Sequence, residues 1–157
     1  MPSSEVQQQR NNSRSCNEDV LLNIEFTRVG NSSLYVKGNA AYILSPGISQ
    51  GLHGKYWFDI REANLQKIGR KEKAWVLLRI VPSWFALFAI ERIREQMNEK
   101  TQDIRVNSGI VYGFYCNLDK HNKLIEITAK NDQSISFSVE LLDLSNIKQS
   151  LETEIKI

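Results

Sequence analysis

The chain has 157 residues, of which 41% are hydrophobic and 24% charged, and its formal net charge is +2. These proportions are typical of a globular domain and argue against a chain that is disordered throughout. No apolar run reaches the ~18 residues of a membrane-spanning helix, and the N-terminal residues lack the apolar stretch of a signal peptide. The sequence therefore predicts a soluble, cytoplasmic protein without a membrane partner.

The first 18 residues are rich in glutamine, serine and asparagine, and after the first two residues only Val6 and Cys16 are apolar. Such a segment buries too little surface to offset the entropy cost of ordering it, so we expect residues 1–18 to form a disordered polar tail. Residues 19–157 are then a single α+β domain. We expect a mainly antiparallel, strongly curved sheet or open barrel, with one longer helix and one short helix.

The first part of this domain reads as strands. Val20–Val29 alternates in part, and Gly30 opens a turn. Leu34–Lys37 and Ala40–Leu44 flank a Gly-Asn pair, which is typical of a tight two-residue hairpin. Residues 45–54 contain three glycines and one proline, and this composition predicts a loop.

Lys55–Arg61 is the most informative strand in the sequence. Alternation places Phe58 with its apolar neighbours on the core side and Trp57 among charged residues on the other side. Glu62–Ile68 has the apolar spacing of a short helix, which should end near a glycine. Ala74–Val81 is nearly continuous apolar sequence and predicts a central strand.

The segment after this strand has the spacing of a helix. Ala86, Ile90, Ile93 and Met97 recur at intervals of four, three and four residues, which predicts a helix over Trp84–Glu99. In the alternative, residues 84–88 stay extended and the helix begins near residue 89.

The last part reads mainly as strands. Gly109–Cys116 is rich in β-branched and aromatic residues. Lys123–Ala129 and Ile135–Leu141 form a hairpin, and matching their apolar faces places Ile127 opposite Phe137. The same register leaves a five-residue loop at residues 130–134. Residues 143–157 fit either a short helix or a final edge strand.

Several chemical motifs fail on inspection. Gly47-Ile48-Ser49-Gln50-Gly51 matches G-x-S-x-G, but a strand follows it where a nucleophile elbow requires a helix. Gly54-Lys55 lacks the remaining residues of a phosphate-binding loop. Cys116 falls in a predicted strand and is expected to be a buried apolar residue. Two isolated histidines and no clustered carboxylates predict neither a metal site nor a cofactor, so we assign no catalytic residue.

Positive charge concentrates in the middle of the chain. Residues 55–105 contain eleven basic and seven acidic residues, a net charge of +4. Basic residues interleaved with aromatic ones suit phosphate contacts and base stacking. The predicted nucleic-acid-binding residues are Lys55, Trp57, Arg61, Lys67, Arg70, Lys71, Lys73 and Arg79. In the competing interpretation, Trp57 and Trp75 are core residues and the charges are solvated.

The runs KYWFDI and AWVLLRIVPSWF resemble strands of accessory DNA-binding domains in prokaryotic restriction systems, including the B3-like pseudobarrels. The resemblance covers about a fifth of the chain and contains no diagnostic motif. It implies a DNA-binding module of a restriction or defence system. The long helix predicted at residues 84–99 departs from a simple barrel.

Three hypotheses remain open. The first is a DNA-binding module. The second is a non-catalytic structural subunit that binds a protein partner or forms a homodimer. The third is a nuclease or another enzyme with a site around Asp59, which a pocket joining Asp59, Arg61 and His53 would favour.

Overall fold

The computed structural model describes residues 21, 24–30, 32–38, 41–50, 55–69, 73–80 and 84–155. The predicted tail at residues 1–18 lies outside these residues. The strands form two sheets, and the α+β class with mainly antiparallel strands is confirmed. The strongly curved sheet or open barrel is not confirmed, because neither sheet closes into a barrel within the described residues.

Sheet A has five strands in the order β1-β2-β3-β6-β7, and only the β3–β6 pair is parallel. Its strands are β1 (Thr27–Arg28), β2 (Leu34–Lys37), β3 (Ala41–Leu44), β6 (Lys73–Ile80) and β7 (Trp84–Ala89). Sheet B has six antiparallel strands in the order β11-β10-β9-β5-β4, and β8 pairs with β9. Its strands are β4 (Ser49–Gln50), β5 (Tyr56–Arg61), β8 (Gln102–Arg105), β9 (Gly109–Asp119), β10 (Leu124–Ala129) and β11 (Ser136–Glu140).

The main core lies between the two sheets. Phe58 of β5 and Phe114 of β9 stack there with ring centroids 5.3 Å apart. In the part of the chain that the structure describes, the helices α2 (Glu62–Ile68), α3 (Ile90–Arg94) and α4 (Leu144–Ile155) accompany the sheets. Helices α2 and α3 contribute Ile68 and Ile93 to this core.

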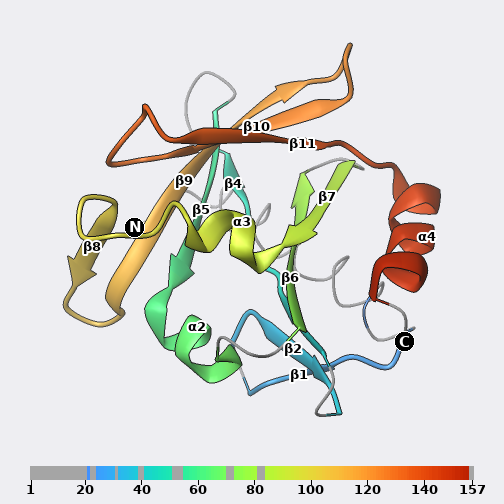
Figure 1. Cartoon of the computed structure of the whole chain (residues 1–157), viewed down its shortest axis with the longest axis horizontal. Coiled ribbons are helices and arrows are strands. Elements are labelled where there is room, and N and C mark those ends of the chain that lie inside the picture. Colours follow the sequence, from blue (N-terminus) through green and yellow to red (C-terminus); the bar gives the residue numbers. More distant parts are fainter. Residues whose placement is uncertain are drawn as a thin grey trace.

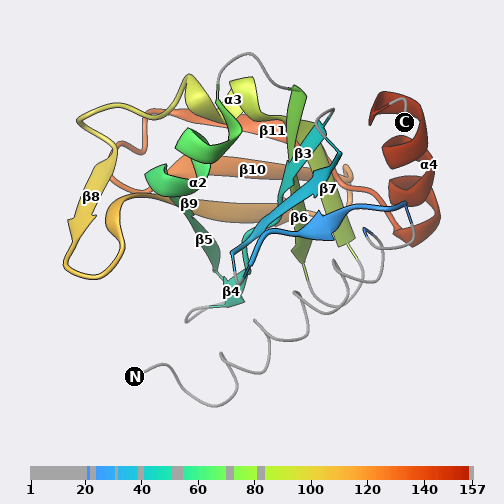
Figure 2. The same cartoon turned by 90° about the horizontal axis from the view of Figure 1, so that it is seen from below.

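A second core lies on the other face of sheet A. There Ile147 and Leu151 of α4 pack with Leu77 of β6 and Phe85 of β7. Figures 1 and 2 show sheet A between α4 and sheet B. The sheets meet at one corner, where the backbones of Phe85 and Leu142 exchange two hydrogen bonds of 2.8 Å. The C-terminal residues, for which a helix and an edge strand were both open, form helix α4.

The helix predicted over Trp84–Glu99 is wrong. Trp84–Ala89 is strand β7, and α3 covers only Ile90–Arg94, close to the alternative that keeps residues 84–88 extended. Residues 85–88 are buried because β7 faces both cores, so the strand shows no apolar–polar alternation. A helical stripe therefore fitted this continuous apolar run by coincidence.

Three smaller differences concern other strands. Within the predicted strand Val20–Val29, the described residues are extended only at β1. The antiparallel pairing of β2 with β3 is confirmed, with Lys37 opposite Ala41, and residues 39 and 40 of the predicted turn lie outside the described residues. Strand β4 lies inside the predicted loop, and β8 was not predicted.

Other predictions are confirmed. Helix α2 has the predicted bounds and ends at Gly69, whose φ of 74° glycine adopts readily. In the β10–β11 hairpin, Ile127 lies opposite Phe137 and Ile125 opposite Val139, as the matching of apolar faces required.

Candidate functional site

A groove of about 660 Å³ lies where β5 runs into α2. Its volume falls within the ~300 to 1,000 Å³ that is usual for ligand sites. Sheet A and its turns form one side of the groove, and β5, α2 and the β8–β9 hairpin form the other. Its polar lining side chains are Ser32, Ser33, Ser49, Trp57, Asp59, Arg61, Asn64, Lys67 and Arg105.

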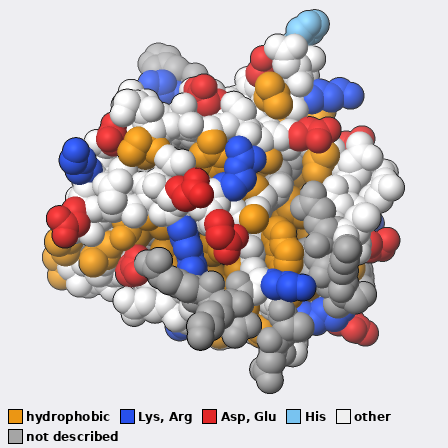
Figure 3. All heavy atoms as spheres, in the orientation of Figure 1, with side chains coloured by type: hydrophobic (Ala, Val, Ile, Leu, Met, Phe, Trp, Pro, Cys, Tyr) orange, Lys and Arg blue, Asp and Glu red, His pale blue; other side chains and the backbone are white. Residues whose placement is uncertain are grey.

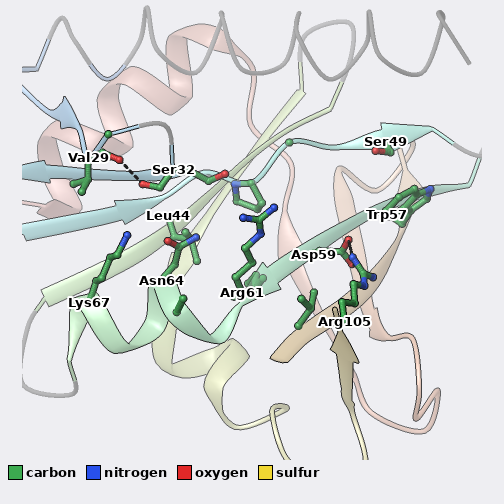
Figure 4. A pocket seen from close by; sticks show the side chains of 17 residues that line it. Val29, Ser32, Leu44, Ser49, Trp57, Asp59, Arg61, Asn64, Lys67 and Arg105 are labelled. Atoms are coloured by element: carbon green, nitrogen blue, oxygen red, sulfur yellow. Dashed lines mark hydrogen bonds and ion pairs between the residues drawn. The ribbon is translucent and has the colours of Figure 1, made fainter. Parts of the chain in front are cut away.

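Local sequence explains why three of these residues lie together. Arg61 is the last residue of β5 and the N-cap position of α2, and Asn64 and Lys67 follow at intervals of three residues. Residues three apart lie on neighbouring turns of one helix face. Figure 4 shows Arg61, Asn64 and Lys67 extending from β5 and α2 into the same space.

Two cations in the groove have no carboxylate partner among the described residues. Arg61 and Lys67 are both exposed, and neither forms a salt bridge with a described residue. Their charges are therefore available to an anion in the groove.

The amide of Asn64 is the third polar group at this point. Asn64 is only 8% exposed, and its side chain makes no hydrogen bond with a described residue. The amide lines the groove and is not among the buried atoms that lack a partner, so it can hydrogen-bond to water or to a ligand there. A ligand in the groove could satisfy it, since an amide both donates and accepts hydrogen bonds.

The third cation of the groove is already paired. Arg105 of β8 donates from its two terminal nitrogens to the two carboxylate oxygens of Asp59, at 3.0 and 3.4 Å. The side chains of Arg105 and Asp59 are 41% and 23% exposed. This ion pair ties the β8–β9 hairpin to β5, and Figure 4 shows it beside Trp57.

The eight predicted residues do not form one surface. Trp57, Arg61 and Lys67 line the groove together. Lys55 is exposed just before β5, and Lys73 is exposed at the start of β6 in sheet A. Arg79 lies on the α4-facing side of sheet A, since it shares a face with Leu77 of the second core. Arg70 and Lys71 lie outside the described residues.

Sequence reasoning missed Asn64 and Arg105. The interval of three between Arg61, Asn64 and Lys67 was present in the predicted helix and could have identified Asn64. No signal pointed to Arg105, because β8 is a short polar strand and its pairing with β9 brings Arg105 to Asp59 from 46 residues away.

Asp59 and Arg61 line the same groove, and His53 lies outside the described residues. Among the residues that the structure describes, no group of three or more His, Cys, Asp and Glu side chains is placed to hold a metal ion. In the same part of the chain, none of the helices has the length and apolar character to cross a membrane.

A smaller recess of about 250 Å³ lies on the other side of α2. There burial raises the pKa of Tyr112, and the nearby negative charge of Glu62, which accepts a hydrogen bond from the tyrosine hydroxyl, raises this pKa further. Arg94 donates to the backbone oxygen of Gly69 at 2.8 Å and so closes the end of α2. The first contact holds α2 against β9 and the second ties the end of α2 to α3, and together they fix the position of Asn64 and Lys67.

No family model, no curated protein and no solved structure matches this chain. The resemblance to B3-like domains therefore stays a prediction, and a proposal about function rests on the geometry of the groove.

Proposed function

We propose that this protein is a nucleic-acid-binding module that contacts DNA through the groove between β5, α2 and sheet A. The observation that carries the proposal is the convergence of Arg61, Lys67 and Asn64 on one groove, with none of the three paired to a described residue. Counting Arg105 and Asp59 as well, the formal charge of the groove is three positive minus one negative, or +2.

The chemistry of the groove suits a phosphodiester chain. Arginine and lysine contact phosphate oxygens, and these contacts position the chain without reading its sequence. Trp57 offers a partly exposed indole on which a base can stack. The resemblance of this segment to strands of B3-like DNA-binding domains favours the same class of ligand, within a restriction or defence system.

Salt-dependent binding tests the proposal. Each phosphate that a protein neutralises on a single strand contributes about 0.7 to the salt exponent of binding. Between about 50 and 200 mM salt, two such phosphates therefore account for about a sevenfold decrease in affinity. The double variant Arg61→Gln/Lys67→Gln should bind a labelled oligonucleotide more weakly than the wild type at low salt. Between these two salt concentrations, the fold-decrease in its affinity should be about seven times smaller than the fold-decrease for the wild type.

A matched control carries the same change of charge away from the groove. Lys120→Gln/Lys148→Gln removes two exposed cations, from the β9–β10 turn and from α4. Fluorescence anisotropy on both double variants and the wild type gives the comparison. The proposal fails if wild-type protein binds no DNA at low salt, or if both double variants weaken binding equally.

One observation favours the second candidate function, a subunit that pairs with another copy of itself. Ile104 and Val106, in the β8–β9 hairpin, are 78% and 102% exposed, and among the described strands β8 pairs only with β9. Exposed apolar groups beside an open strand edge are typical of pairing sites. Light scattering should then show a dimer that Ile104→Lys converts to a monomer. A wild-type monomer at high concentration would exclude this candidate.

A further inference from the structure

The outer face of sheet B carries a row of side chains that continues from the groove. Residues directly opposite one another in an antiparallel sheet share a face, and pairing places Ser49, Trp57 and Tyr115 in one row. Thr128 and Ser136 continue this row across β10 and β11. The row thus begins at the wall of the groove and crosses the whole sheet.

This face points away from the main core. On β5 and β9, the residues that alternate with Trp57 and Tyr115 are Phe58 and Phe114, which are buried between the sheets. Trp57 and Tyr115 are each partly exposed, and Ser136 is exposed. Two large aromatic side chains therefore lie on adjacent strands of a face that reaches solvent.

A further cation lies beside this pair. Lys130 donates its backbone N–H to the oxygen of Gly113 at 2.9 Å, and its side chain runs over that glycine. A Cβ built on Gly113 would lie 3.1 Å from Cδ of Lys130 and 3.3 Å from a carboxylate oxygen of Asp59. The missing side chain at Gly113 thus makes room for Lys130 near the Asp59 carboxylate, two residues from Tyr115 on β9.

We infer that the ligand is an unpaired nucleic-acid strand laid across the outer face of sheet B, with successive bases stacked on Trp57 and Tyr115. This inference rests on the proposed function of the groove. The phosphates lie along one side of the row, where Arg61 is four residues from Trp57 on β5, Lys67 follows on α2, and Lys130 lies beside Gly113, two residues from Tyr115 on β9. Adjacent β-strands are about 4.8 Å apart. This spacing is larger than the ~3.4 Å between stacked bases, so it suits a nucleic-acid strand that is somewhat extended.

Three observations favour an unpaired strand over a duplex. Proteins that read a duplex often insert a helix or a two-stranded ribbon into its major groove, whereas this site is the face of a sheet, where Trp57 and Tyr115 can stack only on unpaired bases. The protruding β8–β9 ribbon has exposed Ile104 and Val106 near its tip, and its Arg105 is bound to Asp59. The face over α2 and α3, seen in Figure 3, has basic and acidic side chains intermixed and offers no broad positive surface for a duplex.

The test compares single strands with a duplex on the full chain. The probes are dT and rU oligomers of about 12 nucleotides and a duplex of the same length. Trp57→Leu and Tyr115→Leu remove a ring but keep an apolar side chain, while Trp57→Phe and Tyr115→Phe keep a ring. We expect tighter binding of a single strand than of duplex. We expect each leucine variant to weaken single-strand binding by about five- to 150-fold, the contribution of one base–aromatic stack, and each phenylalanine variant to retain most of the affinity.

Fluorescence keeps the test valid if a leucine variant fails to fold. An oligomer that stacks on Trp57 should quench tryptophan emission in wild-type protein, and Trp57→Phe should remove most of that quenching. Duplex binding at least as tight as single-strand binding would overturn the inference and leave the proposed function standing. So would folded leucine variants with unchanged affinity, or emission that the oligomer leaves unquenched. Absence of binding to every probe at low salt would overturn both this inference and the proposed function.

Discussion

Replacing Asp59 by asparagine should strengthen the binding of an anionic ligand. Asp59 is the one acidic side chain that lines the groove among the described residues, and its carboxylate accepts both hydrogen bonds from Arg105. The asparagine variant is nearly isosteric but leaves Arg105 without a charged partner. The formal charge of the groove rises from +2 to +3.

The size of the effect follows from the spacing along β5. A phosphate at Arg61 lies two residues from Asp59, or about 7 Å at ~3.3 Å per residue. Two unit charges at this distance interact by about 0.6 kcal/mol in water. The groove is open to solvent, so the aqueous value applies, and the dissociation constant should fall by about threefold. Loss of an exposed ion pair costs only about 0.2 to 1 kcal/mol of folding stability.

Anisotropy titrations with an oligonucleotide at low salt measure this effect. Glu152→Gln is the matched control, because it removes one negative charge from an exposed position on α4, beyond sheet A. We expect tighter binding for Asp59→Asn alone, with a gain that shrinks at high salt. Unchanged affinity would refute the placement of phosphate in the groove. Weaker binding would show that the Asp59 carboxylate itself contacts the ligand.

Three further predictions concern the fold. Ile147→Ala should lower the free energy of unfolding by about 2 to 5 kcal/mol, because Ile147 is fully buried against sheet A. Leu144→Ala, at an exposed position of the same helix, should lower it by about 0.5 kcal/mol or less. Equal losses in denaturant titrations would contradict the packing of α4. Burial raises the pKa of Tyr112, and the Glu62 carboxylate, which accepts a hydrogen bond from its hydroxyl, raises this pKa further. The contribution of Tyr112 to stability is therefore complete below pH 10.0 and is lost as pH rises through the higher pKa of the folded state. Tyrosinate absorbance and unfolding titrations follow this alkaline loss, which should be absent in Tyr112→Phe. Cys116 is buried, and burial raises the pKa of its thiol. A Cys16→Ser variant leaves Cys116 as the one cysteine of the chain, so it should react with a thiol reagent only after unfolding. Rapid labelling of the folded variant would contradict this burial.

Sequence patterns predicted those elements whose two faces differ. The β10–β11 register follows from sequence because apolar and polar residues alternate there, so matching Ile127 with Phe137 aligns every other pair. Helix α2 follows for a similar reason, since Leu65 and Ile68 are buried while Lys67 is exposed.

Elements without such contrast were missed. Strand β7 is buried on both faces, so Phe85 and Ala86 face different cores and no alternation marks the strand. Strand β8 is a short edge element whose one large apolar residue, Ile104, is exposed. Local patterns report burial on one face only, and these two strands are defined by their pairing with distant segments.

The same limit applies to the candidate site. Trp57, Arg61 and Lys67 are within eleven residues of one another, and a strand followed by a helix brings them to one groove. Tyr115 and Arg105 join them only through the pairing of β5 with β9 and of β9 with β8. Arg79 was grouped with these residues in sequence, but alternation along β6 places it on the same face as Leu77, which is the side of sheet A that faces α4.

Chemical-shift mapping by NMR tests the central claim most directly, because it locates the ligand on the molecule. Titration of labelled protein with a dT oligomer should shift the backbone signals of Arg61, Asn64 and Lys67 and the indole N–H signal of Trp57. The amide signals of α4, on the far side of sheet A, should stay in place. Shifts confined to α4, or a spectrum unchanged by the oligomer at low salt, would contradict a nucleic-acid site in this groove.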